Sequence, residues 1–154
     1  IHSGQEFARS KVIPEDKTVK DSLQGTIDHN TYNKDNEVNY INYKHAEINS
    51  ELVEYYKGLI SLRCKYDAFR RAEYEEITFF DVRDNHFAVG YHIKHAGEEF
   101  IVLMNANPKK KEEFHLPKGE WQVLVNKVEA GTEVLSSVKE KIVIDASTGV
   151  VLKK

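Results

Sequence analysis

Residues 87–94, Phe-Ala-Val-Gly-Tyr-His-Ile-Lys, carry the pattern that decides the fold. Their odd-numbered positions, from Phe87 to Ile93, are large and apolar, whereas the positions between them are smaller or polar. A period of two is typical of a β-strand with one buried face. A continuous apolar run follows at residues 100–104 and predicts a central strand covered on both faces. We therefore expect a β-sheet around these two segments.

Weaker strand patterns continue to the end of the chain. Trp121 to Val125 alternates again, and short strands are expected near residues 132–135, 141–144 and 150–152. Turn-forming residues separate the strands, at Asp84-Asn85, Ala96-Gly97, Asn107-Pro108, Pro117-Lys118-Gly119 and Ser147-Thr148-Gly149. About seven or eight short strands at such spacing predict an antiparallel β-sandwich.

Before the strands, residues 50–65 carry a helical pattern of apolar residues three and four positions apart. Ser50 is a suitable N-cap, acidic residues follow in the first turn, and basic residues stand in the last. Gly58 costs about 1 kcal/mol relative to alanine inside a helix, and a close approach to a strand would explain it. The helix needs a surface to cover its apolar face, which the next segment has to supply.

Residues 8–49 show no sustained period, and we expect a long loop there. Its central stretch, residues 28–43, is rich in side chains that favour turns over a core, with five asparagines, three tyrosines and two aspartates. Amides, carboxylates and aromatic rings are the groups that hold a neutral, hydroxyl-rich ligand. A solvated linker would have the same composition, so the neighbouring motifs have to decide.

The charge and the apolar content of the chain limit the classes of partner it could bind. Charged residues make up 31 % of the chain and apolar residues 40 %, with a formal net charge of −3. Neither half of the chain carries a basic excess that could neutralise phosphates, so we expect no nucleic acid partner. The apolar runs are far shorter than the ~20 residues that span a bilayer, so no membrane span is expected.

Single residues give few signs of reactive chemistry. Cys64 is the only cysteine, which rules out an internal disulfide, and it is more typical of a small core residue than of a nucleophile. His92 and His95 are three positions apart in a strand region, so they would point to opposite faces and offer no metal site. No cofactor is expected. The chain opens with Ile1 rather than methionine, which suggests a piece of a longer protein and leaves the compartment open, whether secreted, periplasmic or cytoplasmic.

Three blocks of sequence share their order and spacing with a known family. They are Ile1-His2-Ser3-Gly4-Gln5-Glu6-Phe7; Asn30-Thr31-Tyr32-Asn33 with Asp35 and Val38-Asn39; and residues 53–63 with Ala68-Phe69-Arg70. These blocks resemble the carboxyl-terminal portion of type I pullulanases, starch-debranching members of glycoside hydrolase family 13 in the α-amylase superfamily. The resemblance covers residues 1–72, and the strands beyond them are similar to the family's C-terminal β-domain in architecture.

The resemblance implies a fold that is mainly β. Residues 73–154 would form the antiparallel β-sandwich, preceded in residues 1–72 by the last strand, loop and helix of a (β/α)₈ barrel. Residues 1–7 would end the eighth strand and residues 8–49 would form the loop after it, on the side where such barrels place their active sites. The family binds sugar there with an aspartate and a polar or basic residue four positions later, which matches Asp35 and Asn39. Asn30 and Tyr32 in the same loop are further candidates for substrate contacts.

The resemblance also implies that this chain contains no catalytic residue. The family cleaves glycosidic bonds with retention, using a carboxylate nucleophile, an acid/base and a third aspartate, all on strands that would precede Ile1. Asp35 with Glu37, or Glu112 with Glu113, could supply a pair of carboxylates, but adjacent acidic residues in loops are ordinary surface features. We therefore expect the isolated chain to be inactive.

Two functions remain open. In the first, the chain is part of an enzyme that hydrolyses α-1,6-glucosidic bonds in an α-glucan such as pullulan, starch or glycogen, with the upstream part of its own polypeptide as a partner. In the second, it is a non-catalytic carbohydrate-binding β-sandwich with an ordered arm. A binding module needs an exposed aromatic platform, and Trp121 lies in an alternating strand where burial is favoured.

Overall fold

The structure is a computed structural model that describes residues 2–13, 15, 24–28, 31–82 and 85–154. Contacts divide the chain into two compact units, Ile1–Val53 and Glu54–Lys154. We call them the loop unit and the sheet unit. The division falls inside helix α2 (Ser50–Lys65), because most of that helix packs on the sheet. The boundary at residue 72 that the family resemblance implies stays a prediction.

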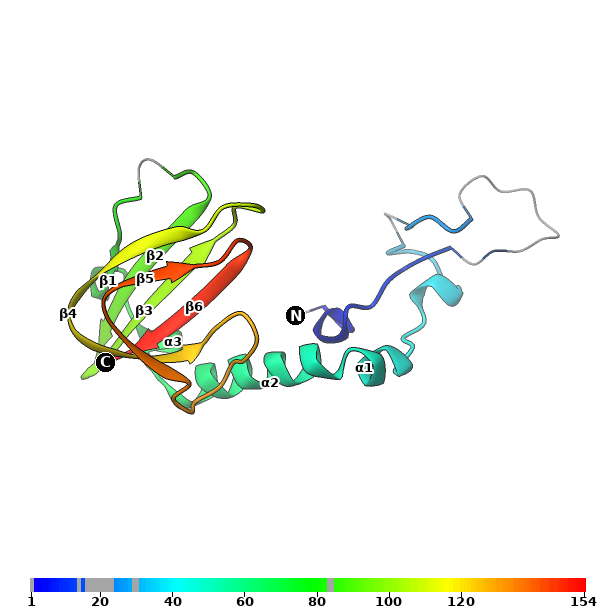
Figure 1. The fold of residues 1–154 in the computed structure, drawn as a ribbon. Helices are drawn as coiled ribbons and strands as arrows, with labels where there is room; N and C mark the ends of the chain where they lie inside the picture. Colours follow the sequence, from blue (N-terminus) through cyan, green and yellow to red (C-terminus); the bar gives the residue numbers. More distant parts are fainter. Residues whose placement is uncertain (1, 14, 16–23, 29–30, 83–84) are drawn as a thin grey trace. The chain divides into compact units, whose positions relative to one another are not determined.

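The described residues of the sheet unit form six antiparallel strands (Figure 1). They are β1 (Ile77–Phe79), β2 (Ala88–His95), β3 (Glu98–Asn105), β4 (Glu112–Val125), β5 (Ser136–Ile144) and β6 (Thr148–Lys153). The order across the sheet is β1-β2-β3-β6-β4-β5. Helix α2, the short helix α3 (Ala68–Arg71) and the 3-10 turn η3 (Tyr74–Glu76) precede them. The predicted mainly β, antiparallel fold is thus confirmed.

The six strands form one hydrogen-bonded sheet that folds over on itself. Strand β4 has 14 residues, and its pairing with β5 shifts register between His115 and Glu120. A Cβ built on Gly90 of β2 would lie 3.2 Å from Cε1 of Phe114 on β4, although two other strands separate β2 from β4 in the sheet. A flat sheet would keep those strands about 14 Å apart at the usual spacing. The first half of β4 therefore faces β2 across a core, in the manner of a sandwich.

Strand β3 lies at the centre, as the apolar run predicts. Phe100 and Ile101 are both 0 % exposed and point to opposite faces. On one face, Phe100 packs in a helix-side cluster with Leu62 of α2 and with Tyr66, which follows the helix. On the other, Ile101 packs in a far-side cluster with Trp121. Trp121 is itself 0 % exposed, and its Nε1 donates to the carbonyl of Pro117 at 2.9 Å, so its expected burial is confirmed.

Several local expectations were wrong. Strand β2 does not bury one face throughout: Ala88 and Ile93 are buried on opposite faces, and Phe87 is 53 % exposed. The helices cover the face of β2 that carries Ile93 only near that residue, so Phe87 and Val89 on the same face remain exposed to solvent. Residues 132–135 form no strand but belong to the connection between β4 and β5, whereas β1 was not expected.

The helical segment also departs from expectation in detail. Its bounds are those predicted, but Ser50 is inside α2 rather than its N-cap, because a short helix α1 (Lys44–Ile48) precedes it and Asn49 joins the two. The amide of Val53 donates to the carbonyl of Asn49 at 3.1 Å. Cys64 is exposed rather than part of the core, since it lies on the side of α2 that faces away from the sheet.

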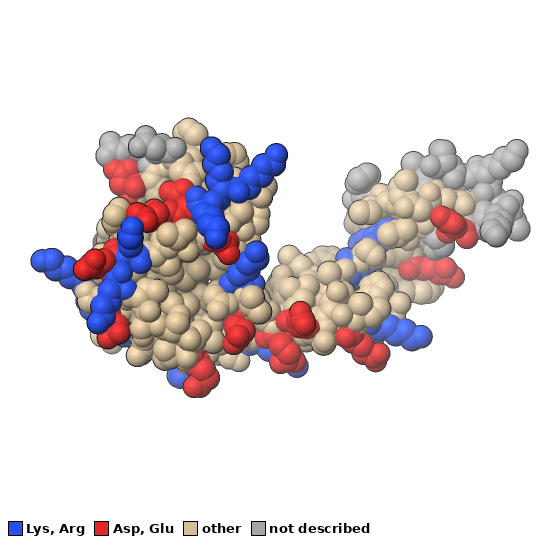
Figure 2. Space-filling model, viewed as in Figure 1, with Lys and Arg blue, Asp and Glu red and all other residues tan. Residues whose placement is uncertain are grey.

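Both signs of charge are spread over the sheet unit. In Figure 2, lysine, arginine, aspartate and glutamate side chains alternate over the face of this unit that is in view. Ion pairs join several of them, such as Lys141 with Glu113 at 2.9 Å and Lys111 with Asp145 at 2.7 Å. Among the residues that the structure describes, no helix is long and apolar enough to cross a membrane.

Gly58 of α2 lies against the connection between β4 and β5, as its position in the helix suggested. A Cβ on this residue would lie 1.8 Å from the carbonyl oxygen of Ala130, which is backbone and cannot swing aside. Ala130 is held in place by an isolated bridge to Val125 at the end of β4. The helix therefore touches the chain backbone to backbone at this point.

We predict that Gly58→Ala lowers the free energy of unfolding of the sheet unit. The gain in helix propensity is about 1 kcal/mol, but relieving the overlap with Ala130 requires a backbone shift, and overpacking costs about 1–3 kcal/mol or more. Gly131→Ala is the matched control, since a Cβ there meets nothing within 4 Å. Urea unfolding of the two variants would show a lower midpoint for Gly58→Ala alone; equal midpoints would contradict the prediction.

Candidate functional site

The candidate site lies in the loop unit, where a turn at the start of the chain supports the polar loop. Residues 2–4 form a turn that leads into the 3-10 helix η1 (Gln5–Phe7), and Gly4 has φ 89°. No strand is present among the described residues of this first segment, and Ile1 lies outside the described residues. Phe7 is buried and packs its ring against that of Tyr43, with centroids 6.1 Å apart. Its carbonyl accepts a hydrogen bond from the side-chain amide of Asn49 at 3.0 Å.

Asn39 holds the polar loop together. It ends the 3-10 helix η2 (Glu37–Asn39), and its side-chain amide donates to the carbonyl of Thr31 at 2.6 Å and to that of Lys34. Thr31 and Val38 are buried at the base of this loop. Since both amide hydrogens are engaged within the loop, only Oδ1 of Asn39 remains to accept a bond from a ligand.

The other predicted site residues are presented to solvent. Asp35 is exposed, and no described residue bonds to its carboxylate. Tyr32 is 85 % exposed. Asp35 follows Lys34, whose carbonyl is bonded to Asn39, so the structure ties these two predicted residues to one loop. Asn30 lies outside the described residues.

Basic side chains anchor the loop, which the sequence did not indicate. Arg9 donates to the backbone carbonyl of Asn39, and Nζ of Lys11 lies 2.5 Å from Oγ1 of Thr31. Nζ of Lys34 lies 2.5 Å from a carboxylate oxygen of Asp28. These pairs are up to 30 residues apart, so no periodic pattern could reveal them. Two open hollows of about 480 and 270 Å³ adjoin Arg9.

The exposed groups of the loop unit suit a polar, uncharged ligand. Its exposed rings include those of Tyr32, Tyr40 and Tyr43, and Asp35 adds a carboxylate that can accept two neighbouring hydroxyl groups. Aromatic rings cover the apolar faces of sugars, and amide and carboxylate groups bond to their hydroxyls.

Comparison with known proteins gives a consistent fold. No protein-family model matches the chain. A pullulanase from Bacillus acidopullulyticus is similar over 98 % of this chain, with 22 % identity and a TM-score of 0.76. The GBS pullulanase SAP in complex with maltotetraose is similar over 100 % of it, with 22 % identity and a TM-score of 0.79. Type I pullulanase from Bacillus subtilis str. 168, complexed with maltose, covers 99 % at 24 % identity and a TM-score of 0.73.

The chain has the fold of the C-terminal region of pullulanases. It spans 18 % of the first of these pullulanases and 25 % of the second. Because the match covers nearly all of this chain, it includes the loop unit as well as the sheet unit. The expected resemblance to type I pullulanases is thereby confirmed at the level of the fold.

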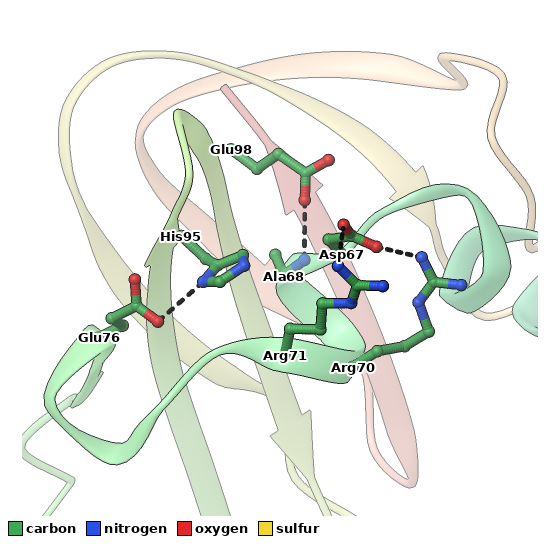
Figure 3. A network of polar contacts seen from close by, with 7 residues as sticks. All are labelled: Asp67, Ala68, Arg70, Arg71, Glu76, His95 and Glu98. Atoms are coloured by element: carbon green, nitrogen blue, oxygen red, sulfur yellow. Dashed lines mark hydrogen bonds and ion pairs between the residues drawn. The ribbon is translucent and has the colours of Figure 1, made fainter.

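A second polar cluster lies on the sheet unit of this pullulanase fold, where α3 and η3 meet the β2–β3 hairpin (Figure 3). Nδ1 of His95 lies 2.8 Å from Oε2 of Glu76, and the amide of Ala68 donates to Glu98 at 2.8 Å. The backbone amide of Glu73, followed by His95, holds the pKa of Glu76 below its ordinary value. These bonds fasten the segment between α2 and β1 onto the sheet, which is a structural role.

His92 and His95 have separate partners. Nε2 of His92 lies 2.9 Å from Oε1 of Glu99, and its ring meets that of Trp121 edge-on at 5.5 Å. Burial lowers the pKa of His92 below its ordinary value of 6.5, although Glu99 opposes that effect. Within the described part of the chain, no group of three or more His, Cys, Asp or Glu side chains is placed to hold a metal ion.

We predict that His92 makes the sheet unit less stable as the pH falls through 6.5. Its pKa is lower in the folded state, so the unfolded chain binds the proton more readily and protonation favours unfolding. Carboxylates with a lowered pKa, such as Glu76, lose their contribution to stability only as the pH falls below about 4.5. The effect of His92 therefore appears at higher pH than theirs. Lys94 and Lys154 also face His92 and oppose its charge.

Urea unfolding between about pH 7.5 and 5.5 tests this linkage. His92→Gln should flatten the decline in stability over that range, whereas His115→Gln, at an exposed histidine of β4, should leave it unchanged. Equal slopes for the wild type and His92→Gln would show that His92 does not cause the decline.

Proposed function

We propose that this chain is the C-terminal part of a debranching glycoside hydrolase that cleaves α-1,6-glucosidic bonds in an α-glucan such as pullulan, starch or glycogen. The loop unit forms one wall of the substrate cleft, and the sheet unit is the trailing β-domain. The upstream part of the same polypeptide supplies the nucleophile and acid/base carboxylates that retaining hydrolysis requires. No cofactor takes part.

The observation that carries this proposal is the extent of the fold match. Pullulanases match the chain over 98 % to 100 % of its length, so the likeness includes a loop with few apolar residues of its own. Two pullulanases of this fold were solved with maltotetraose and one with maltose. These ligands are α-linked glucose oligomers, and the exposed groups around Asp35 have the chemistry to bind such a ligand.

Four residues of the loop have distinct parts in the proposal. Asp35 accepts hydroxyl hydrogen bonds, since its carboxylate has no competing partner among the described residues. Tyr32 offers its ring to the apolar side of a glucose unit. Asn39 shapes the loop through its amide and offers only Oδ1 to the ligand. Asn30 is included on the family resemblance alone.

The alternative, a free-standing carbohydrate-binding β-domain, has weaker support. Trp121, its best candidate for a binding platform, is completely buried and bonded to Pro117. Exposed aromatic side chains of the loop unit, by contrast, belong to the loop that carries Asp35, as Tyr32 does, or follow it directly in sequence, as Tyr40 does. The proposed debranching enzyme requires contact with the glucan through the loop unit.

We predict that the isolated 154-residue chain releases no reducing sugar from pullulan or maltooligosaccharides. On this proposal the acid and the nucleophile are absent from it, because both belong to the upstream part of the polypeptide. Assay of the purified chain beside a polypeptide that includes the upstream region tests this. Hydrolysis by the short chain that disappears on Glu112→Gln or Asp35→Asn would overturn the proposal.

In the longer enzyme, Asp35→Asn should weaken maltotetraose binding while leaving the melting temperature unchanged. Losing a charged hydrogen-bond acceptor costs about 1.5–3 kcal/mol, which is about a ten- to hundredfold loss in affinity. Glu37→Gln, at another exposed acid of the same loop, is the matched control. Calorimetric titration with maltotetraose gives the affinities, and equal affinities for both variants would remove Asp35 from the site.

Asn39→Ala should behave differently from Asp35→Asn. It leaves the carbonyls of Thr31 and Lys34 without their donor, which costs about 1–3 kcal/mol where such groups are buried. We therefore expect faster amide hydrogen exchange across residues 31–39 together with weaker binding. Unchanged exchange in this variant would show that Asn39 does not organise the loop.

A further inference from the structure

Arg9 connects the turn at the start of the chain to the candidate sugar-binding loop. Its Nη1 donates to the carbonyl of Ser3 at 3.3 Å, and its Nη2 donates to the carbonyl of Asn39. Nε of Arg9 is buried and has no hydrogen-bond partner in the described part of the chain. A cation that is half-buried between two backbone carbonyls holds them at a fixed separation, because the guanidinium is planar and its donors are rigid.

The turn fixes Arg9 in place. Its backbone amide donates to the carbonyl of Gly4 at 2.8 Å. Its side chain lies across Gly4 so closely that a Cβ there would be 2.7 Å from both Cβ and Cδ of Arg9. Gly4 also has φ 89°, which side chains rarely adopt. Arg9 is therefore packed closely on the turn and bonded to its backbone.

On the loop side, the contact falls on the residue that organises the loop. Asn39 accepts from Arg9 through its carbonyl and donates through its side chain to Thr31 and Lys34. The loop from Thr31 to Asn39, which contains Asp35, is thus closed on a residue held by Arg9. Lys11 adds a second tie through Oγ1 of Thr31.

We propose that Arg9 is a positioning residue for α-glucan binding. It holds the loop at residues 31–39 against the turn at Gly4, so that Asp35 and Tyr32 meet the ligand in a fixed arrangement. It touches no ligand itself. This inference rests on the proposed function, because it concerns the same loop and the same class of ligand.

Lysine should not replace Arg9, since a single ammonium cannot donate to Ser3 and Asn39 in the same fork geometry. In the longer enzyme, we expect Arg9→Lys and Arg9→Ala to raise the maltotetraose Kd and the KM for pullulan by about tenfold or more. The kcat should change little if, as the proposed function implies, the loop contacts the glucan away from the cleaved bond. Methylguanidine in solution should partly restore the affinity of Arg9→Ala. Arg71→Lys and Arg71→Ala, at an exposed arginine of the sheet unit, should leave all these values unchanged.

A double-mutant cycle separates this inference from the proposed function. If Arg9 acts through the loop, Arg9→Lys and Asp35→Asn should affect the maltotetraose Kd less than additively when combined. A loss of affinity with Asp35→Asn but none with Arg9→Lys would overturn the positioning role and leave the proposed function standing. A wild-type enzyme that binds no maltotetraose would overturn the proposed function itself. Additive effects of Arg9 and Asp35 would overturn the positioning role as well.

Discussion

The burial of strand β3 on both faces is the constraint on which the sheet unit depends. Phe100 and Ile101 are adjacent in sequence, are fully buried, and point in opposite directions. Burying such a side chain contributes about 1.5–3 kcal/mol, but only if each face is covered. Helix α2 covers the Phe100 face, and the folded half of β4 with its neighbours covers the Ile101 face. The helix and the folded sheet thus each bury one of the two faces of β3.

The sequence predicted those parts of the fold that depend on residues close together in the chain. The central strand, the bounds of α2 and the close approach at Gly58 all come from local patterns. The exposure of Phe87 could not be predicted, because it depends on how far the helices extend over the sheet. The exposure of Cys64 depends on which face of α2 meets the sheet, since Leu62, two positions earlier, is buried there. Residues 132–135 contain β-branched and apolar side chains as a strand does, but the backbone bends there and strand β5 begins only at Ser136.

For the candidate site, the sequence indicated the loop and its ligand-facing residue types but not its framework. Asp35 and Tyr32 are exposed, as contact residues must be. The side-chain amide of Asn39 donates to two carbonyls within the loop, so this residue has a structural role in addition to any contact with sugar. Arg9 and Lys11 reach across 30 and 20 residues to loop atoms, and contacts at such separations have no signature in a single sequence.

The long strand β4 has a consequence for how this domain can vary. Because one unbroken strand belongs to both layers of the core, no linker exists at which the β-domain could be divided into two exchangeable halves. Additions of sequence are tolerated only where the chain leaves the sheet, as in the connections at residues 106–111 and 126–135. The second of these is pressed against Gly58, which restricts it as well. Insertions and deletions in such domains should therefore occur in the connections between strands, while the length of β4 stays constant.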